Sequence, residues 1–451
     1  MIDSLMLQKY DIPLPRYTSF PAVPYWNPQS IDVQTWKKNI QETFRQENKK
    51  LSVYIHLPFC EELCTYCACN KRVTKNHQVE LPYIESLLAE WRMYLNIFEE
   101  KPILEEIHLG GGTPTFFSPQ NLSYFLHELL KTVEVSAEHE FSIEVHPNYT
   151  SYQHLEELSI IGFRRISLGV QDFDKEVQYI INRPQTFEQT KKVVEWARQL
   201  DYQSINIDLV YGLPKQSVGS FTNTLHLVRT LQPNRIALYS YAHVPWKSKA
   251  QRRYSEEDLP DARLKWEIYQ TAYQYFTQNG WQPIGMDHFA LPSDNLFIAY
   301  QKGKLHRNFM GYTTNTHRLL IGLGCSSISD TWTAFAQNEK EVEAYQQKVQ
   351  QKTLPIFHGH LLSEQDKVIR KHILNLMCRH QTTIQPADFE LNMLESIFKK
   401  LLSLERDELL QLQGNTVVVT EKGRLFVRVI CAAFDNYLQQ NLSFPVFSKA
   451  I

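Results

Sequence analysis

Short apolar runs alternate with longer amphipathic stretches through the first half of the chain. The runs are rich in β-branched and aromatic residues and are bounded by glycine, proline and polar residues, which is the pattern of buried strands. Six strands are predicted in this way: Leu51–Leu57, Ile103–Leu109, Glu140–Val145, Arg165–Val170, Ser204–Val210 and Arg235–Ser240. Because an amphipathic stretch separates each strand from the next, the pattern predicts a parallel sheet with right-handed helical crossovers.

The stretches between the strands carry helix signals. Apolar residues recur at helical spacing over Ile84–Leu95 and over Phe221–Val228. Thr186 and Gln189 stand at capping-box spacing in front of Val193. These signals predict helices that cover the outside of the sheet.

The start of the chain has a different pattern. Residues 1–50 contain five prolines, and five aromatic residues lie between Tyr10 and Trp26. That content is too aromatic for a solvated tail, so we expect an arm that packs on the body near the mouth of the active site and ends in a short helix near Val33–Asn48.

The second half of the chain completes the main domain and then becomes helical. A helix is predicted near Asp261–Asn279, and from about residue 362 to 441 helices dominate. The run 410–420 indicates a hairpin around Gly414 and Asn415, as in a winged-helix-like module. The segment has no basic concentration, so a lid or a wall of the substrate site is expected rather than DNA binding. We expect three domains, at 1–50, 51–350 and 351–451.

Composition narrows the function classes. The 451 residues include 47 Lys and Arg against 49 Asp and Glu, a net charge of -2, which gives no electrostatic argument for nucleic acid or membrane partners. The start of the chain lacks a basic segment followed by an apolar one, and no apolar run approaches about 18 residues. A cytoplasmic protein is expected.

Four of the seven cysteines lie within ten residues, directly after the first predicted strand, at Cys60, Cys64, Cys67 and Cys69. A structural zinc site usually pairs one short cysteine hook with a second one, but the other three cysteines stand far apart. A disulfide pair lacks the secretory signal that would accompany it. Three thiolates from Cys60, Cys64 and Cys67 instead fit a [4Fe–4S] cluster whose fourth iron stays open.

Other candidate residues follow the ends of the remaining predicted strands, where barrel enzymes build their sites. They are Gly110–Pro114 after the second strand, Glu144 at the end of the third, Gln171 after the fourth, Asp208 at the end of the fifth and Ala242 after the sixth. The glycine turn allows a ligand to approach the backbone closely. Phosphate binding is the alternative for this turn, but no G-x4-G-K-[ST] pattern is present.

At this point the residues resemble a known family. The C-x3-C-x2-C spacing after an apolar strand resembles the signature of radical S-adenosylmethionine (SAM) enzymes. The longer run from Tyr54 to Lys71 resembles the oxygen-independent coproporphyrinogen III oxidases, also called coproporphyrinogen dehydrogenases. The resemblance extends over essentially the whole chain, through Asp11–Ser19, Gly169–Phe173, Asn206–Gln216, Gly285–Phe289, Leu305–Phe309 and Gly423–Phe426.

The resemblance implies an α/β fold, a curved (β/α)6 partial barrel, and a set of site residues. It implies that the first SAM is contacted by Tyr54, Gly111, Glu144 and Ile328. It implies a second SAM, contacted by Tyr66, Gly112, Thr113, Gln171, Arg183, Asp208 and Ala242. Taken singly, Ala242 and Ile328 are equally well explained as core residues and Arg183 as a surface cation.

The family also implies roles close to the cluster. Cys69 is not a cluster ligand but, with Tyr54 and Glu144, belongs to the catalytic residues. Heme chaperones related to this family usually carry Phe at the position of Cys69, so its presence favours the dehydrogenase. His56 is expected to form a hydrogen bond near the cluster rather than to bind iron.

The implied reaction is oxidative decarboxylation of two propionates of coproporphyrinogen III to vinyl groups, giving protoporphyrinogen IX in heme biosynthesis. It requires a SAM-derived 5′-deoxyadenosyl radical and an electron donor such as flavodoxin or ferredoxin, and a monomer without nucleic acid or membrane insertion is expected. Two alternatives stay open: a heme chaperone of the superfamily, and a radical SAM methyltransferase or heme-opening enzyme.

One residue departs from the family pattern. Met310 stands where glutamine is expected, within a run that otherwise follows the family. Methionine offers only a weak sulfur acceptor and a flexible apolar stem in place of an amide. The departure bears on substrate identity.

Overall fold

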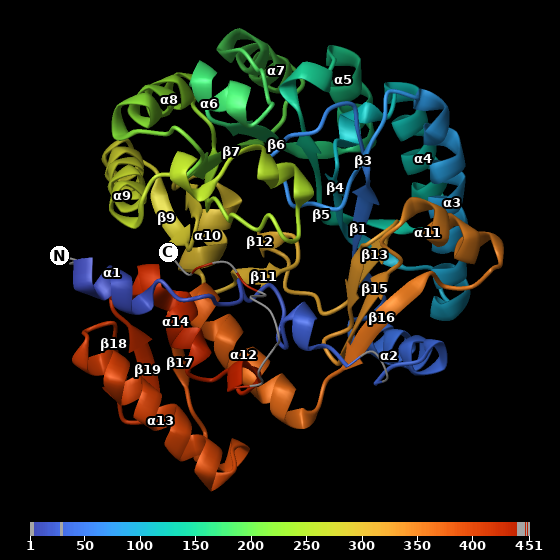
Figure 1. Ribbon diagram of the computed structural model, residues 1–451. Helices are drawn as coiled ribbons and strands as arrows, with labels where there is room; N and C mark the ends of the chain where they lie inside the picture. Colours follow the sequence, from blue (N-terminus) through green and yellow to red (C-terminus); the bar gives the residue numbers. More distant parts are fainter. Residues whose placement is uncertain (1–3, 28–29, 440–446, 448, 450–451) are drawn as a thin grey trace. The chain divides into compact units, whose positions relative to one another are not determined.

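The structure is a computed structural model that describes residues 4–27, 30–439, 447 and 449 (Figure 1). These residues form two compact units. The larger unit comprises 27–275 and 317–361, and the smaller unit comprises the residues up to 26, 276–316 and those from 362 onward. The domains predicted at 1–50, 51–350 and 351–451 follow one another along the chain and stay a prediction.

The larger unit is organised around six parallel strands, and all six predicted strands are confirmed. In the order of the sheet they are β1 (Lys50–Leu57), β4 (Ile103–Gly111), β5 (Glu134–Val145), β6 (Phe163–Gln171), β7 (Ser204–Tyr211) and β8 (Arg235–Ser240). β5 starts six residues before the predicted strand, because a polar and largely exposed stretch continues the pairing with β4.

Further strands extend the sheet beyond β1. β13 (Leu320–Leu323) pairs parallel with β1, and β14 (Ile328–Asp330), β15 (Ala334–Asn338) and β16 (Ile356–Leu361) follow as antiparallel neighbours. In the described part of the chain the sheet is curved but is not closed into a barrel. The predicted α/β partial barrel is confirmed.

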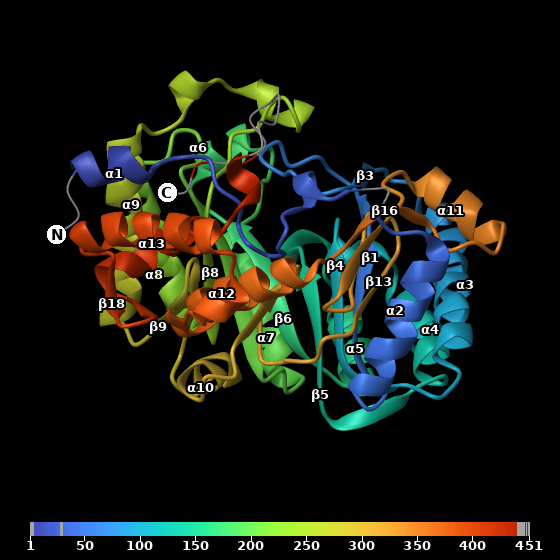
Figure 2. The ribbon, with the colours of Figure 1, turned by 90° about the horizontal axis from the view of Figure 1, so that it is seen from below.

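Helices cover the outside of these strands, as the crossovers require. They include α2 (Val33–Gln46), α3 (Glu80–Phe98), α4 (Pro119–Leu130), α5 (Tyr152–Ile161), α6 (Lys175–Ile180), α7 (Phe187–Gln199), α8 (Val218–Leu231) and α11 (Val342–Gln350). Both ribbon views show α3 and α4 on the outer side of β1 and β4 (Figures 1 and 2). The predicted capping box of α7 is present, with Thr186 Oγ1 accepting a hydrogen bond from Gln189 N at 3.2 Å.

The core of the larger unit lies between this helical layer and the sheet. Val53, Ile55 and Leu57 of β1 are completely buried and pack in one cluster with Trp91 and Phe125 of the helices. The opposite positions of β1 carry Tyr54 and His56, which point to the inner face of the sheet. Apolar residues therefore fix each strand from outside and leave its inner positions for polar side chains.

The smaller unit contains α1 (Ser4–Tyr10), α10 (Asn295–Gln301), α12 (Glu364–Arg379), α13 (Leu391–Arg406), α14 (Val427–Ala432) and the hairpins β9–β10 (Gln282–Gly285, His288–Ala290) and β11–β12 (His306–Asn308, Gly311–Thr313). β17 (Gln381–Thr383), β18 (Leu410–Gln413) and β19 (Thr416–Val419) form a small sheet, which confirms the predicted hairpin; its Gly414 has φ 61°. α9 (Ala262–Gln278) links the two units along the chain.

The N-terminal arm is part of the core of the smaller unit. Tyr10, Leu14, Tyr17 and Phe20 are buried among apolar residues of the C-terminal helices. The Tyr17 hydroxyl donates a hydrogen bond to Asp435 Oδ2 at 3.1 Å. The prediction that the arm is too aromatic for a solvated tail is confirmed.

Candidate active site

The cysteine-rich segment forms a loop at the carboxyl end of β1. Phe59–Cys60 (β2) pairs with Arg72–Val73 (β3), so the loop leaves and returns at one place. Cys60 is buried, Cys64 and Cys67 are half-buried, and Cys69 is exposed. The loop therefore keeps all four thiols in one short, closed segment.

Cationic and hydroxyl groups contact these thiols. Thr113 Oγ1 lies 3.4 Å from Cys60 Sγ, and Arg183 Nη1 lies 3.4 Å from Cys64 Sγ. A hydrogen bond with Cys69 lowers the pKa of the Cys67 thiol, and the positive charges of Lys71 and Arg183 lower it further. Burial of the thiol opposes these effects. Burial raises the pKa of the Cys60 thiol to about 11.

This arrangement fits a cluster better than a single ion. No three His, Cys, Asp or Glu side chains in the described ranges are close enough together to hold one metal ion. In a [4Fe–4S] cluster each thiolate binds a different iron, so the sulfurs need not converge on one point. The positive charges of Lys71 and Arg183 suit the anionic thiolates that such a cluster requires.

The glycine turn after β4 packs directly on the start of this loop. Gly112 N and Thr113 N donate to Leu57 O and Phe59 O at 2.8 and 2.9 Å. A Cβ atom on Gly112 would lie 2.6 Å from the backbone of Pro58, so a side chain there would displace the loop. Gly111 has φ 112°, a conformation that glycine adopts without strain.

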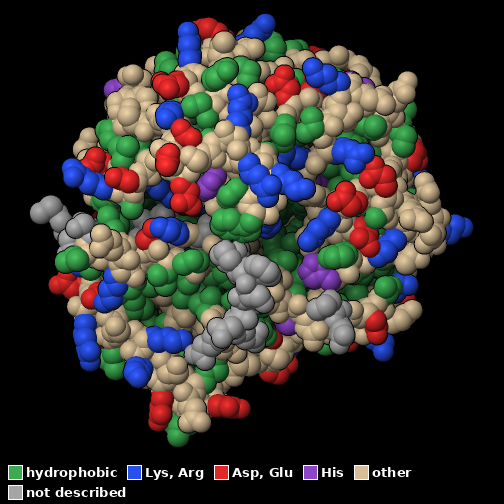
Figure 3. Space-filling view, viewed as in Figure 1, with side chains coloured by type: hydrophobic (Ala, Val, Ile, Leu, Met, Phe, Trp, Pro, Cys, Tyr) green, Lys and Arg blue, Asp and Glu red, His purple; other side chains and the backbone are tan. Residues whose placement is uncertain are grey.

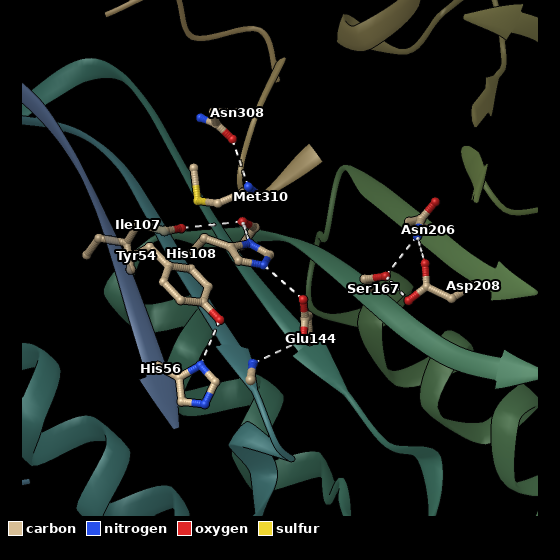
Figure 4. A network of polar contacts seen from close by, with 12 residues as sticks. Tyr54, His56, Ile107, His108, Glu144, Ser167, Asn206, Asp208, Asn308 and Met310 are labelled. Atoms are coloured by element: carbon tan, nitrogen blue, oxygen red, sulfur yellow. Dashed lines mark hydrogen bonds and ion pairs between the residues drawn. The ribbon is translucent and has the colours of Figure 1, made fainter. Parts of the chain in front are cut away.

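Glu144 at the end of β5 is held by two donors. His108 Nε2 lies 3.3 Å from its Oε1, and Gly111 N donates to its Oε2 at 3.3 Å (Figure 4). His108 Nδ1 is in turn 2.7 Å from Ser142 Oγ. Burial disfavours the carboxylate, but the hydrogen bond and charge of His108, together with Gly111 N–H, lower the pKa of Glu144.

Tyr54 lies beside this pair and is oriented by His56. His56 Nε2 faces the carbonyl of Asn70 at 2.9 Å, so this nitrogen carries the proton. Burial lowers the pKa of His56, which leaves its Nδ1 unprotonated. Nδ1 therefore accepts a hydrogen bond from the Tyr54 hydroxyl, with an O–N distance of 3.1 Å. The Tyr54 oxygen therefore offers only lone pairs to a ligand.

A second group of polar residues lies on the inner face of β6 and β7. Asp208 was predicted at the end of its strand, but β7 continues to Tyr211, so Asp208 lies within the strand. Asp208 accepts hydrogen bonds from Ser167 Oγ at 2.8 Å and Asn206 Nδ2 at 2.7 Å (Figure 4). Burial raises the pKa of Asp208 to about 6, although the hydrogen bond from Ser167 opposes this. Both donors to Asp208 are hydroxyl or amide groups, whereas Glu144 is held by a histidine ring and a backbone N–H.

Arg183 and Gln171 belong to the same region. Arg183 Nη2 donates to Gly169 O at 2.5 Å, and Gln171 is buried with φ 68°. Arg183 Nε and Asn206 Oδ1 are buried without a hydrogen-bond partner among the described residues. Orphaned polar atoms of this kind are costly unless a bound molecule pairs with them.

Three further residues were predicted to contact SAM, namely Tyr66, Ala242 and Ile328, and the structure places them as follows. The carbonyls of Tyr66 and Ala242 both accept from Gln251 Nε2, at 2.8 and 3.2 Å. Ile328 begins β14, and the backbone of Gly322 packs against it so closely that a Cβ would lie 2.6 Å from Ile328 O. Every expected site residue thus belongs to the larger unit.

Known proteins identify the fold and the family. The sequence profile of the radical SAM superfamily matches residues 54–228. The chain is 38% identical to the oxygen-independent coproporphyrinogen III oxidases of Pseudomonas aeruginosa and Escherichia coli, over 100% of this chain and 98% of each relative. It also matches the structure of a coproporphyrinogen III oxidase from Escherichia coli, described as a radical SAM enzyme. That match has a TM-score of 0.89 at 37% identity and covers 97% of this chain and 99% of the other.

The chain belongs to the oxygen-independent coproporphyrinogen III oxidase family. Membership confirms the resemblance seen in the sequence and the radical SAM class of enzyme. The superfamily implies a [4Fe–4S] cluster and SAM. None of the helices within the described ranges has an apolar stretch long enough to cross a bilayer.

Several residues of this family member support the site but were not predicted from the sequence. His108, Ser142, Ser167, Asn206 and Gln251 contact the expected residues without belonging to the expected set. Four of them are polar residues at inner positions of otherwise apolar strands. That alternation is visible in the sequence and is the signal that could have found them.

Proposed function

We propose that this protein oxidatively decarboxylates two propionates of coproporphyrinogen III to vinyl groups without oxygen, giving protoporphyrinogen IX. Full-length similarity to coproporphyrinogen III oxidases supports the substrate. One observation carries the proposal. At the carboxyl ends of adjacent strands, the glycine turn is hydrogen-bonded both to the start of the cysteine loop and to Glu144.

Cys60, Cys64 and Cys67 would hold the [4Fe–4S] cluster. When bound, the cluster supplies the electron with which radical chemistry on SAM begins. Thr113 and Arg183 contact two of the thiols and fix them, and the loop pairing of β2 with β3 limits movement. Cys69 is exposed, and its thiol, which forms a hydrogen bond with Cys67, would act on substrate.

Tyr54, Gly111, Glu144 and Ile328 would bind the first SAM. An ionised Glu144 and the lone pairs of Tyr54 both accept hydrogen bonds, and the ammonium group of SAM donates them. The site thus presents acceptors where the ligand has donors. Glycine at 110 to 112 lets the side chains of Tyr54, Glu144 and His56 and the start of the cysteine loop pack directly against this turn, which places them around the proposed ligand.

The second SAM would be bound by Tyr66, Gly112, Thr113, Gln171, Arg183, Asp208 and Ala242. The unpaired Arg183 Nε suits a carboxylate and Asp208 suits a hydroxyl or ammonium donor. Saturation binding of SAM to cluster-loaded protein tests this part. A stoichiometry of one SAM per chain with an intact cluster contradicts it.

An anaerobic assay with coproporphyrinogen III, SAM and a reductant, read by product chromatography, tests the main proposal. Protoporphyrinogen IX is expected. Unchanged coproporphyrinogen together with SAM cleavage contradicts it, and methylated or opened heme in a parallel assay would assign a heme-modifying enzyme. Heme retention without SAM cleavage would assign a chaperone.

The remaining parts of the proposal concern the state of the protein in the cell. We infer an electron donor such as flavodoxin or ferredoxin, a monomer, and a cytoplasmic location. Figure 3 supports the lack of a nucleic-acid partner, since acidic and basic side chains intermingle over most of the visible face. Light scattering of the purified protein and cell fractionation check the monomer and the location.

A further inference from the structure

A short basic segment lies against the cysteine loop. Residues 246–253, here called the basic strap, follow β8 and contain Trp246, Lys247, Lys249, Arg252 and Arg253 but no acidic residue. All five side chains are exposed, and Trp246 has 53% of its surface accessible. The strap lies in the yellow-green segment near the top edge of Figure 2.

Two side chains of the strap form hydrogen bonds with the backbone of the cysteine loop. Ser248 Oγ donates to Cys67 O at 3.1 Å, and Gln251 Nε2 donates to Tyr66 O at 2.8 Å. Gln251 is completely buried, and its Oε1 accepts from Val244 N at 2.6 Å. The exposed cations therefore have a fixed place beside a proposed cluster ligand.

An exposed aromatic side chain continues this surface. Tyr179 of α6 has 73% of its surface accessible, and the Arg253 guanidinium lies 5.5 Å from its ring centroid. The end of α6 is bonded to the cysteine loop as well, through Thr65 N to Ile181 O at 2.9 Å. Tyr179 and Trp246 add two large aromatic side chains to this charged surface, a residue type enriched at the cores of protein interfaces.

The cations of the strap form no ion pairs with other residues that the structure describes. They are Lys247, Lys249, Arg252 and Arg253. Glu256 and Glu257 follow the strap and Asp258 pairs with Lys215 at 2.9 Å. The hydrogen bonds to the cysteine loop come from 248 and 251, so the basic part of the segment is the part beside the cluster ligands.

We propose that the basic strap, with Trp246 and Tyr179, is the docking surface for a small acidic electron-transfer protein. The inference rests on the proposed function, because a cluster at Cys60, Cys64 and Cys67 needs an external one-electron donor. One electron leaves the donor and enters the cluster, and no bond forms or breaks. Positive charge beside the cluster attracts an acidic carrier and orients its redox centre toward Cys67.

The test uses cluster-loaded protein with two probes, reduced flavodoxin and reduced ferredoxin. Lys247→Glu combined with Lys249→Glu should weaken binding of the productive donor by at least about tenfold and slow cluster reduction in stopped flow by a similar factor. Binding to the wild type should weaken with added salt, and the double variant should lose most of this dependence.

A matched control places the same charge changes elsewhere. Lys38→Glu on α2 combined with Arg229→Glu on α8 changes two exposed cations on outer helices and should leave donor binding within about twofold. SAM cleavage with dithionite should be equal in all three proteins, since a small reductant needs no docking surface.

Four outcomes overturn the inference. Equal binding of both probes to the strap variant and the wild type is the first. Loss of affinity of the variant for coproporphyrinogen, with donor binding retained, would assign the strap to the substrate carboxylates. Strap-dependent binding of phosphatidylserine vesicles without donor binding would assign a membrane. If dithionite gives no SAM cleavage in the wild type, the proposed function fails first and removes the need for a donor.

Discussion

Two carboxylates on the parallel strands, Glu144 near the end of β5 and Asp208 within β7, have opposite electrostatic environments. Glu144 faces a histidine and a backbone N–H, and its pKa is lowered. Asp208 accepts hydrogen bonds from the neutral Ser167 and Asn206, and its pKa is raised to about 6 by burial and by the charge of Glu144, against the charge of Arg183. One is a permanent anion at neutral pH, whereas the other titrates close to it.

The difference bears on what each site can hold. A permanent anion suits a ligand that must bind whenever it is present, as the proposed first SAM must for radical chemistry. A carboxylate that titrates near neutrality makes binding depend on pH. Glu144 itself contributes to the raised pKa of Asp208, so the two carboxylates are electrostatically linked.

The largest effect is expected from loss of the proposed [4Fe–4S] cluster, on which radical chemistry with SAM depends. Cys60→Ala, Cys64→Ala and Cys67→Ala should each reduce iron from about four per chain to near zero, since a cube needs its thiolates. Cys69→Ala should keep the iron and lose activity. Iron and sulfide analysis of anaerobically purified protein measures this, and stoichiometric zinc without sulfide would refute the cluster.

The next effect separates the two carboxylates. Glu144→Gln should weaken the first SAM roughly 10- to 100-fold, because a charge-assisted hydrogen bond to the ligand ammonium is lost. Asp208→Asn should weaken only the second SAM, by about tenfold or less, and leave reductive SAM cleavage detectable. Two-site binding isotherms measure both, and equal losses at both sites would remove the distinction.

A pH series gives the next effect. Asp208 must be ionised to accept a donor from the ligand, and with a pKa of about 6 its ionised fraction falls about tenfold between pH 7 and pH 5. Second-site affinity should fall by about that factor as pH falls, while the first site changes little. Asp208→Asn is the control and should show no such dependence; a pH-dependent first site would contradict the assignment.

Substitution of His108 should make SAM binding at the Glu144 site depend on pH, as is predicted for the Asp208 site. His108→Phe keeps a ring beside Tyr54 but removes the hydrogen bond to Glu144, so the pKa of Glu144 should rise. First-site affinity should then fall by about three- to tenfold at pH 5 relative to pH 7. His108→Gln retains a donor and serves as the control. If both variants behave alike, the histidine acts through packing and not through this hydrogen bond.

How far the sequence predicts this site depends on whether the contacts are local. The six strands and the cysteine loop were predicted because an apolar run and its bounding residues lie together in the chain. Two partners that were missed, His108 of Glu144 and Ser167 of Asp208, come from neighbouring strands, whereas Asn206 lies on the same strand as Asp208. His108 pairs in register with Ser142, and Ser167 with Asn206. A one-residue change in register would turn these side chains to the other face, and the pattern of one strand does not determine the register of its neighbour.

The domain organisation shows a similar limit. The arm at residues 4–26 and the segment 276–316 join the C-terminal helices in one compact unit. Their burial depends on aromatic side chains such as Tyr17, which contacts Asp435 more than 400 residues away along the chain. Aromatic content predicted that the arm packs, but the identity of its partner required the structure.

The smallest expected effect concerns Met310, which belongs to neither carboxylate group. It lies in the turn between β11 and β12, where its backbone N–H donates to Asn308 Oδ1 at 2.9 Å, so the turn is held without the side chain. A single hydrogen bond contributes about 0.5–1.5 kcal/mol, so Met310→Gln should change the rate of protoporphyrinogen IX formation by roughly tenfold or less. Met310→Leu, which keeps an apolar side chain of similar size, is the matched control and should resemble the wild type. Steady-state rates under anaerobic conditions measure both variants. If the wild type cleaves SAM but leaves coproporphyrinogen III unchanged, and Met310→Gln restores decarboxylation, the methionine marks a different substrate and the proposed reaction is wrong for this chain.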